Sequence, residues 1–410
     1  MPNLLITCSG PGTRSTGYTK FHKALIRVGN CAVIDHIINS YTDIGTIYIT
    51  LGFEGDLIKE YIKHAQYTNV EFIEIKDWMS NQIKSFQQIP EHVFDQPFYY
   101  NACDNWTTVV PKPSGNTYYT CNPQLESHYD SDGDSVYSGI AYIEDSQQYY
   151  QILQSATITR NDLLLYQQLD SLNSVLLDNW YDVGNEQSYK QTLLHHNDSF
   201  NVLDKTHQEV YTTNNRVIKL FEDKPDIDFD SVSFPHPNPV EHSDNALSYE
   251  FVDGVVNPTD TSYKVLLDSL CQLWNFSIAN NHSTYNTKLW QDKTWSRFNQ
   301  LIQQHPEFGD TIILNGKTLD PTRIIENLPW HKIISGIQGP THGDLVLDNI
   351  VVGEGKVTYI DHRQGRVDDI YYDVCKFYHS LHLHNINLKS AWSLTQNDNE
   401  YTINLSLSEL

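Results

Sequence analysis

Three side chains in the C-terminal third of the chain have the types and spacing that phosphoryl transfer from ATP requires. The run His342-Gly-Asp344-Leu-Val-Leu-Asp-Asn349 places an Asp five residues before an Asn, and Asp361 closes the apolar run Tyr-Ile-Asp361. In such a reaction one carboxylate accepts the proton of the attacking hydroxyl, while an Asn and a second Asp hold Mg²⁺ against the phosphates. This pattern therefore indicates a magnesium-dependent phosphotransferase.

The elements around these residues would bring them together. The runs 350–352 and 356–360 are apolar, and Gly353-Glu-Gly355 between them predicts the turn of a β-hairpin. The hairpin would carry Asp361 back beside the loop that holds Asp344 and Asn349. The alternative interpretation is a solvated loop between two core strands.

Residues 199–384 resemble the aminoglycoside phosphotransferase and choline kinase family. The resemblance implies Asp344 as catalytic base, Asn349 and Asp361 as magnesium ligands, and His342 as a residue that orders the loop. The segment after Asp361 resembles the ending of phosphotransferases found in bacterial surface-polysaccharide clusters. There, Arg363 would meet a phosphate or an anionic substrate, and an ion pair with Asp369 or Asp373 is an equal alternative.

The resemblance is weaker in the small lobe, which is the part of the kinase-like domain that would bind ATP. Val217-Ile-Lys219-Leu-Phe221 resembles the strand that carries the nucleotide-binding Lys, and the strand ending at Glu250 resembles the hinge that contacts adenine. A surface position is the alternative for Lys219. No Gly-rich loop precedes Lys219, and prolines interrupt the stretch that follows, so a small lobe of reduced size is expected.

A second candidate site begins at the N-terminus. The apolar run Leu4-Leu5-Ile6 predicts a buried strand, and it leads into Ser9-Gly10-Pro-Gly12-Thr13-Arg14. A strand that ends in a Gly-rich turn lets backbone N–H groups approach a phosphate. Arg14 and Lys23 would add positive charge at the α-phosphate. No G-K-[ST] follows, so this is not a Walker A loop.

This region resembles the sugar-phosphate and phosphocholine nucleotidyltransferases, whose signature runs G-x-G-T/S-R…P-K. The residues that match are Gly10, Gly12, Thr13, Arg14 and Lys23. The chain departs from the signature because His22 replaces the Pro before the Lys, and because the interval between Arg and Lys is short. Lys20 is therefore a rival for the role of Lys23.

Later segments follow the order of the same family. The segment 98–105 resembles the strand end that places a metal-binding Asp, here Asp104, and 137–143 resembles a strand that lines the substrate pocket. The segment 179–189 resembles W-x-D-x-G, whose Asp, here Asp182, supplies a second metal carboxylate. A simple strand-to-turn position is the alternative for Asp104.

Length and composition fit two enzymatic domains. The 410 residues suggest a Rossmann-like α/β nucleotidyltransferase domain at 1–197, followed at 198–410 by a kinase-like α+β phosphotransferase domain with a reduced small lobe. The net charge of −24 argues against a nucleic-acid-binding surface. The six cysteines form no C-x-x-C pair and are expected to be buried free thiols in a reducing cytoplasm. No apolar run reaches about 18 residues, so no membrane span is expected.

Together these patterns suggest a bifunctional enzyme. The C-terminal domain would phosphorylate a small alcohol with ATP. The N-terminal domain would couple the phosphomonoester to a pyrimidine nucleoside triphosphate, with CTP preferred, and both steps would use Mg²⁺. The product would be an activated donor for a surface polysaccharide or phospho-decoration. A sugar 1-kinase joined to a sugar-nucleotide pyrophosphorylase, and a regulatory or scaffolding protein with one inactive domain, are the alternatives. Homo-oligomerisation is left open.

Overall fold

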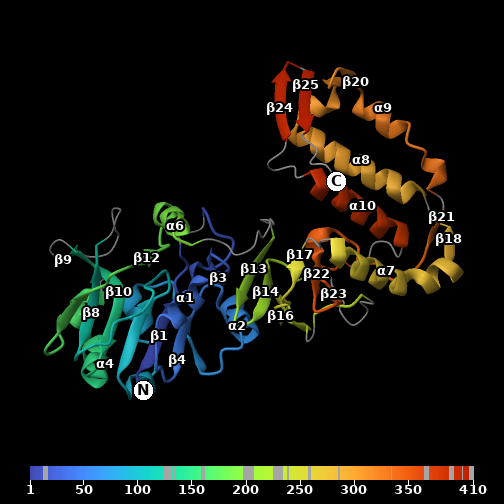
Figure 1. The fold of residues 1–410 in the computed structure, drawn as a ribbon. Helices are drawn as coiled ribbons and strands as arrows, with labels where there is room; N and C mark the ends of the chain where they lie inside the picture. The colour runs from blue at the N-terminus through green and yellow to red at the C-terminus, as the bar shows by residue number, and fades with distance from the viewer. Residues whose placement is uncertain are drawn as a thin grey trace. The chain divides into compact units, whose positions relative to one another are not determined.

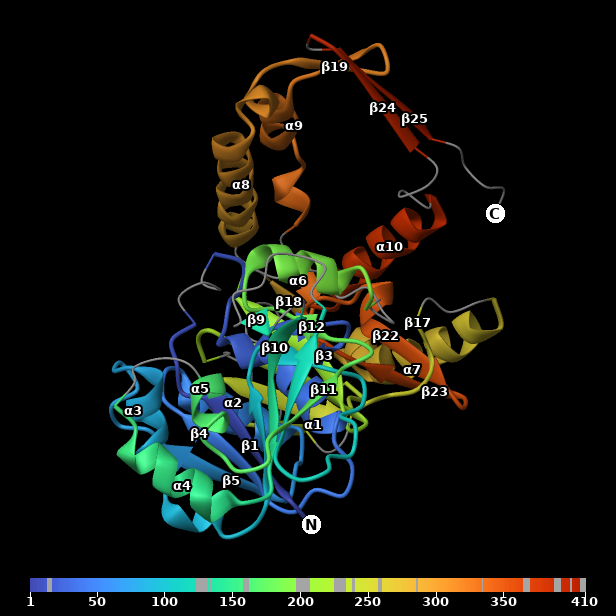
Figure 2. The same ribbon diagram turned by 90° about the vertical axis from the view of Figure 1, so that its left-hand side faces the viewer.

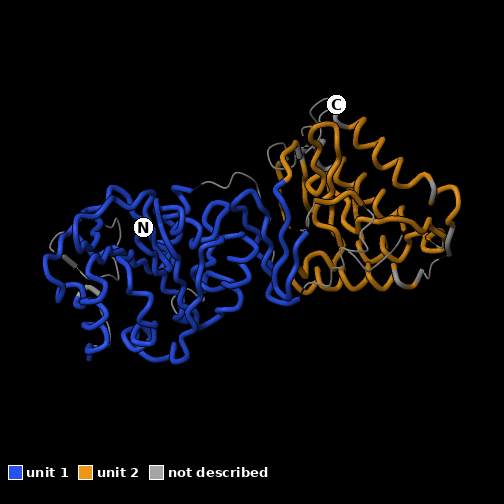
Figure 3. The backbone as a smooth tube through the Cα atoms, turned by 90° about the horizontal axis from the view of Figure 1, so that it is seen from below, with its two compact units in different colours: residues 1–225, 239–251 blue, residues 226–238, 252–410 orange. Residues whose placement is uncertain are grey.

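The structure is a computed structural model of the chain. It describes residues 1–12, 17–122, 131–132, 135–157, 162–196, 207–224, 234–237, 240–256, 260–284, 287–333, 335–363, 369–386, 392–398 and 400–405. The chain divides into two compact units (Figure 3). Unit 1 comprises Met1–Pro225 and Pro239–Phe251, and unit 2 comprises Asp226–Asn238 and Val252–Leu410. The sequence predicts a boundary at 197/198 between the nucleotidyltransferase-like and kinase-like domains, and this boundary stays a prediction.

Unit 1 is built on a mixed, Rossmann-like β-sheet, as expected from the sequence (Figure 1). Its strands follow the order β11-β8-β10-β6-β1-β4-β5, with β9 beside β10. The strand bounds are β1 Asn3–Cys8, β4 Ile47–Leu51, β5 Val70–Glu74, β6 Phe98–Ala102, β8 Thr117–Cys121, β9 Ser131–Asp132, β10 Ser135–Ile143 and β11 Asn173–Leu176. Strands β6, β1, β4 and β5 are parallel, whereas β10 runs antiparallel to both of its long neighbours.

Alternating side chains of β1 enter two different hydrophobic cores, because successive residues of a strand point to opposite faces of the sheet. Leu4 and Ile6 pack with residues of α1 and α2, whereas Leu5 packs with residues of α3, α4 and α5. The helices are α1 Val33–Asn39, α2 Gly55–His64, α3 Gln82–Phe86, α4 Ser146–Ser155, α5 Asp162–Tyr166 and α6 Glu186–Leu193. Figure 2 shows α3, α4 and α5 along one flank of the sheet. Both faces are therefore covered, and the predicted strand at Leu4–Ile6 is confirmed.

A second sheet in unit 1 lies in the segment where the sequence predicts a reduced kinase-like small lobe. Its antiparallel strands follow the order β13-β14-β16-β15, with bounds Gln208–Thr213, Arg216–Phe221, Ala246–Glu250 and Val240–His242 respectively. The fully buried side chains of Tyr211, Ile218 and Leu220 belong to the same core as Ile58 and Tyr61 of α2. This small sheet is therefore an integral part of unit 1.

Unit 2 combines long helices with short paired strands. The helices are α7 Asp260–Asn280, α8 Thr287–Gln304, α9 Pro321–Glu326 and α10 Ile370–Ile386. The strands are β17 Val255–Val256, β18 His282–Thr284, β19 Ile312–Leu314, β20 Lys317–Leu319, β21 Ser335–Ile337, β22 Ile350–Gly353, β23 Lys356–Tyr359, β24 Trp392–Asn397 and β25 Glu400–Leu405. Its core joins Leu266 and Trp274 of α7 to Ile350, Tyr359 and Ile370. The sequence of 263–278 and of 288–304 has an amphipathic pattern that predicts two helices, and these are confirmed as α7 and α8. The predicted hairpin is confirmed as β22–β23. The kinase-like character of this half stays a prediction.

The expectation of six buried cysteines is partly wrong. Cys8, Cys103 and Cys121 are buried and Cys31 is half-buried, but Cys271 and Cys375 are exposed. Both exposed thiols lie on helices, where the face turned away from the core meets solvent. Among the described residues, no helix combines the length and the apolar character that crossing a bilayer demands.

Candidate active sites

The first candidate site lies where β1 and β6 end. These strands are parallel neighbours, so the Gly-rich turn after Cys8 and the turn that holds Asp104 meet at the same edge of the sheet. Gly12 has a φ of 56°, in the left-handed region that favours glycine. Gly10 precedes it, and a Cβ there would meet no atom within 4 Å. Thr13 and Arg14 lie outside the described residues.

His22 connects the Gly-rich turn to Lys23. It caps the 3₁₀ helix Lys23–Leu25, where its Nδ1 accepts a hydrogen bond from the Ala24 N–H. Its Nε2 therefore carries the proton, and it donates to the Gly10 carbonyl at 3.0 Å. Burial, reinforced by the neighbouring Lys23 charge, lowers the pKa of His22 to about 4. A neutral imidazole thus positions this segment where the family signature has a Pro.

Lys23 contacts a carboxylate at the centre of this site. Its Nζ lies 2.7 Å from Oδ2 of Asp104, which is almost completely buried. Lys20, the rival in the sequence, instead lies 3.5 Å from a carboxylate oxygen of Glu209 on β13. The structure therefore brings Lys23, and not Lys20, to the predicted metal-binding Asp.

Asp182 joins the site through a short β-ladder. The strand β12 Tyr181–Asp182 pairs with β7 Asn105–Trp106, and Asp182 lies opposite Asn105. The Val183 N–H also donates to the Asp104 carbonyl at 2.9 Å. Burial and the neighbouring charge of Asp104 raise the pKa of Asp182 to about 7. Lys23, Asp104 and Asp182 thus form one electrostatically coupled cluster.

This cluster has the chemistry of a partial magnesium site. Mg²⁺ is usually held by one or two carboxylates together with water and the phosphates of a substrate. Two close carboxylates repel each other, and a divalent cation between them would relieve that repulsion. No group of three or more His, Cys, Asp or Glu side chains in the described part of the chain is arranged to hold a metal ion. Asp104 and Asp182 are thus the two side chains of this cluster that could contribute oxygen ligands to Mg²⁺.

The second candidate site is the loop between β21 and β22 in unit 2. Asp373, in the first turn of α10, accepts hydrogen bonds from the backbone N–H groups of His342 and Gly343. Burial raises the pKa of Asp373 to about 6, although these two hydrogen bonds favour its charged form. His342 Nε2 lies 2.8 Å from the Ile360 carbonyl. The loop is therefore tied to α10 and to the end of β23, and the ordering role of His342 stays a prediction.

Gly343 makes this loop geometry possible. It has a φ of 78°, and a Cβ on it would lie 2.0 Å from the Arg363 carbonyl oxygen. Any larger residue would push the segment after Asp361 away from the loop. The glycine between His342 and Asp344 is therefore required by close backbone approach.

Two cations hold the carboxylate of Asp344. Arg363 Nη2 lies 3.2 Å from Oδ2, and Lys376 Nζ of α10 lies 3.0 Å from Oδ1. Arg363 thus pairs with Asp344, and not with Asp369 or Asp373 as the alternative interpretation held. Lys376 was not predicted as a site residue. Lys376 lies three residues after Asp373 on the helix that anchors the loop, and this position could have indicated that it belongs to the site.

The two predicted magnesium ligands of unit 2 lie beside this loop. Asn349 donates its side-chain amide to the Asp344 carbonyl at 2.9 Å, and its own carbonyl accepts from the Ile360 N–H. Asp361 follows directly, with a φ of 62°. A non-glycine residue in the left-handed region is uncommon and often marks a functional position. Asn349 and Asp361 are thus neighbours, as the predicted hairpin requires.

The predicted nucleotide-binding residues Lys219 and Glu250 belong to unit 1, whereas Asp344, Asn349, Asp361 and Arg363 belong to unit 2. Lys219 is 7% exposed, with its Nζ 5.4 Å from the ring centre of Tyr249. It is therefore not a surface lysine. Glu250 ends β16 and is exposed.

No family model matches the chain, and no curated protein matches it. Solved nucleotidyltransferase structures align with its N-terminal half. CTP:phosphocholine cytidylyltransferase from Streptococcus pneumoniae is 15% identical over 47% of this chain and 98% of its own, with a TM-score of 0.40. A putative glucose-1-phosphate thymidylyltransferase from Bacillus anthracis is 13% identical over 50% of this chain and 98% of its own, with a TM-score of 0.39. The inositol-1-phosphate CTP transferase from T. maritima is 11% identical over 47% of this chain and 95% of its own, with a TM-score of 0.37.

Proposed function

We propose that unit 1 is a nucleotidyltransferase that couples a phosphomonoester to a pyrimidine nucleoside triphosphate. The observation that carries this proposal is the cluster of Lys23, Asp104 and Asp182 beside the Gly-rich turn. A cation and two carboxylates at this place suit displacement at the α-phosphate, where negative charge builds up and must be neutralised.

The residues of the chain would act as follows. A phosphate oxygen of the acceptor attacks the α-phosphorus, a new P–O bond forms, and pyrophosphate leaves with the electrons of the broken P–O bond. Lys23 and Arg14 offset the charge on the α-phosphate, and backbone groups of Gly10 to Thr13 cradle the triphosphate. Asp104 and Asp182 would hold Mg²⁺, which orients the triphosphate and withdraws charge from it. His22 stays neutral and fixes Lys23 relative to the turn.

A second activity is proposed for unit 2, namely phosphorylation of a small alcohol with ATP. The supporting observation is the geometry of Asp344, which a buried loop and two cations hold beside Asn349 and Asp361. Asp344 would accept the proton of the substrate hydroxyl, while Arg363 and Lys376 would stabilise the charge of the transferred group. Asn349 and Asp361 would hold Mg²⁺.

The two proposed reactions would be consecutive, because the phosphomonoester that unit 2 makes would be the acceptor in the nucleotidyl transfer of unit 1. Their product would be an activated donor for a surface polysaccharide or phospho-decoration. An amino-alcohol or similar small alcohol with CTP is preferred, and a sugar 1-kinase joined to a sugar-nucleotide pyrophosphorylase is the alternative.

One ³¹P NMR experiment tests both proposals. The full-length protein is incubated with Mg²⁺, ATP, each pyrimidine triphosphate, and choline, ethanolamine or a hexose. The signal of a phosphomonoester is expected to appear first, and the signals of a nucleoside diphosphate ester and of pyrophosphate are expected to follow. Pyrophosphate formation from supplied phosphomonoesters, without phosphorylation of any alcohol, would leave only the nucleotidyltransferase. The absence of both products would contradict the whole proposal.

A further inference from the structure

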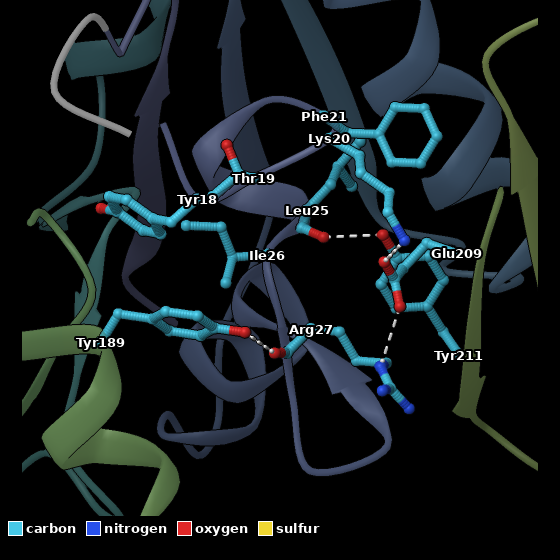
Figure 4. Close-up of a pocket in the computed structure, with 10 residues that line it drawn as sticks. All are labelled: Tyr18, Thr19, Lys20, Phe21, Leu25, Ile26, Arg27, Tyr189, Glu209 and Tyr211. Atoms are coloured by element: carbon cyan, nitrogen blue, oxygen red, sulfur yellow. Dashed lines mark hydrogen bonds and ion pairs between the residues drawn. The ribbon is translucent and has the colours of Figure 1, made fainter. Parts of the chain in front are cut away.

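A pocket of about 220 Å³ lies in unit 1, next to the segment that carries Lys23 (Figure 4). Its walls come from residues 18–27, from α6 and from β13. It is smaller than the ~300–1,000 Å³ of typical sites for drug-sized ligands. Its size therefore favours a compact ligand over a nucleoside triphosphate.

One side of the pocket is charged. Arg27 Nε lies 3.0 Å from one carboxylate oxygen of Glu209, and Lys20 Nζ lies 3.5 Å from the other. All three side chains are mostly buried, with exposed fractions of 17–23%. Lys20 and Arg27 therefore converge on the carboxylate of Glu209 at this side of the pocket. Arg and Lys arranged in this way suit a phosphate, which Arg can bind with two parallel hydrogen bonds.

The other side of the pocket is aromatic. The rings of Tyr18 and Tyr189 are stacked with their centres 5.4 Å apart, whereas the ring of Tyr211 lies on the charged side, next to Glu209 (Figure 4). Their hydroxyls donate to backbone carbonyls, at 2.6 Å for Tyr18, 3.4 Å for Tyr189 and 2.7 Å for Tyr211. With the hydroxyls bound in this way, the rings offer a ligand mainly aromatic surface. Such a surface suits an apolar or cationic group, and it serves the many hydroxyls of a hexose poorly.

The pocket is linked to the proposed transfer site. Tyr18 donates to the carbonyl of Val183, the residue after Asp182, and Tyr189 lies on the helix that follows. Lys20 and Arg27 flank Lys23 in the chain. A ligand held here would therefore lie against the segments that carry two members of the Lys23–Asp104–Asp182 cluster.

We propose that this pocket binds the acceptor of nucleotidyl transfer, and that the acceptor is a phosphomonoester of a compact cationic or apolar alcohol. This inference rests on the proposed nucleotidyltransferase activity. The phosphate contacts Lys20 and Arg27 in competition with Glu209, and the organic group lies against Tyr18 and Tyr189. The pocket thus selects a phosphorylated amino-alcohol over a hexose phosphate.

The first test measures binding without turnover. The full-length protein, without nucleotide or Mg²⁺, is titrated calorimetrically with phosphocholine, glucose 1-phosphate and inorganic phosphate. Lys20→Gln and Arg27→Gln are each expected to weaken phosphocholine binding roughly tenfold or more, because each removes a charge-assisted contact. Glu209→Gln is expected to tighten it, because the competing carboxylate is lost. Lys190→Gln is the matched control, since Lys190 is 72% exposed on α6 beside Tyr189.

A purely structural role for the ion pairs predicts a different result. All three variants would then lose thermal stability, and none would bind phosphocholine more tightly. That outcome, or equal affinity for phosphocholine and glucose 1-phosphate, would overturn the proposal. Tyr189→Leu adds a second readout, since it should reduce the preference for phosphocholine over inorganic phosphate.

The KM of the phosphomonoester, measured with CTP and Mg²⁺, separates this inference from the proposed function. If transfer occurs but Lys20→Gln and Arg27→Gln change neither KM nor affinity, the pocket is not the acceptor site and the function stands. If the variants lose phosphocholine binding but the wild type transfers no nucleotide, the pocket binds phosphomonoesters and the proposed function is wrong.

Discussion

Asp104 and Asp182, which are 78 positions apart in the sequence, are held side by side by the ladder between β7 and β12. The backbone N–H of the residue after Asp182 donates to the carbonyl of Asp104, and the charge of Asp104 helps to raise the pKa of Asp182. Two carboxylates that repel each other at the edge of a sheet form an arrangement that a divalent cation would stabilise. This relationship leads to the first prediction.

Replacing Asp104 by Asn should reduce pyrophosphate release by about 10²–10³-fold, because the site loses a carboxylate while its shape is kept. ATP-dependent phosphorylation in the same protein should be unchanged. Asp56→Asn is the control, because this carboxylate is fully exposed on α2. Equal loss of both activities in Asp104→Asn would show that the two reactions do not have separate sites.

The Asp344→Asn variant should lower ATP-dependent phosphorylation by about 10²–10⁴-fold, the range that one general base contributes. Asn keeps the shape of Asp344 but cannot accept the proton of the alcohol. Nucleotidyl transfer from supplied phosphomonoester serves as the internal control and should survive. A phosphorylation rate within threefold of the wild type would contradict the assignment of Asp344 as base.

Short-range patterns predicted the elements of both sites well. The strand at Leu4–Ile6, the hairpin around Gly353–Gly355 and the helices of unit 2 follow from local periodicity and turn chemistry, which a sequence displays directly. The sequence did not predict which opposite charges would form ion pairs. Arg363 pairs with Asp344, and Lys20 pairs with Glu209, because the packing of distant segments decides which charges meet.

Lys376 is the clearest case of a partner that the sequence did not reveal, and it gives the third prediction. Lys376→Gln should reduce phosphorylation about tenfold, because Asp344 then loses one of the two cations that orient it and the transferred phosphoryl group loses a positive neighbour. Lys356→Gln, an exposed position on β23, is the matched control. If both variants phosphorylate the alcohol at the same rate, Lys376 has no part in the reaction.

The fourth prediction concerns Asp35, a buried carboxyl group of α1. It accepts hydrogen bonds from the Tyr61 and Tyr67 hydroxyls and from the Ala32 N–H, yet burial raises its pKa to about 6. The folded state therefore binds a proton more tightly than the unfolded state. Stability from this group is fully present below about pH 4 and is lost as the pH rises towards 6, by up to about 3 kcal/mol.

This dependence can be measured by urea unfolding of the wild type and of Asp35→Asn between pH 4 and pH 7. The variant should be less stable at pH 4, because an amide cannot accept all of these hydrogen bonds, and the difference should narrow as the pH rises. Asp56→Asn should run parallel to the wild type. Parallel curves for Asp35→Asn and the wild type would show that Asp35 does not titrate in this range.

The last prediction tests whether the small sheet β13–β16 is needed by unit 1. A fragment of residues 1–197 contains every predicted nucleotidyltransferase residue but lacks this sheet. Tyr211, Ile218 and Leu220 are completely buried in the core shared with α2. Losing three such side chains removes about 5–9 kcal/mol at about 1.5–3 kcal/mol each, which is comparable with the whole stability of a typical domain. The fragment 1–197 should therefore aggregate or melt well below the full-length protein.

The fragment 1–251 is the control, and it should stay folded and transfer nucleotide. It carries the substitution Phe234→Ser, because Phe234 belongs to the core of unit 2 and would be exposed in this fragment. Equal solubility and melting temperature for the two fragments would show that the N-terminal fold is complete without the strands that follow it.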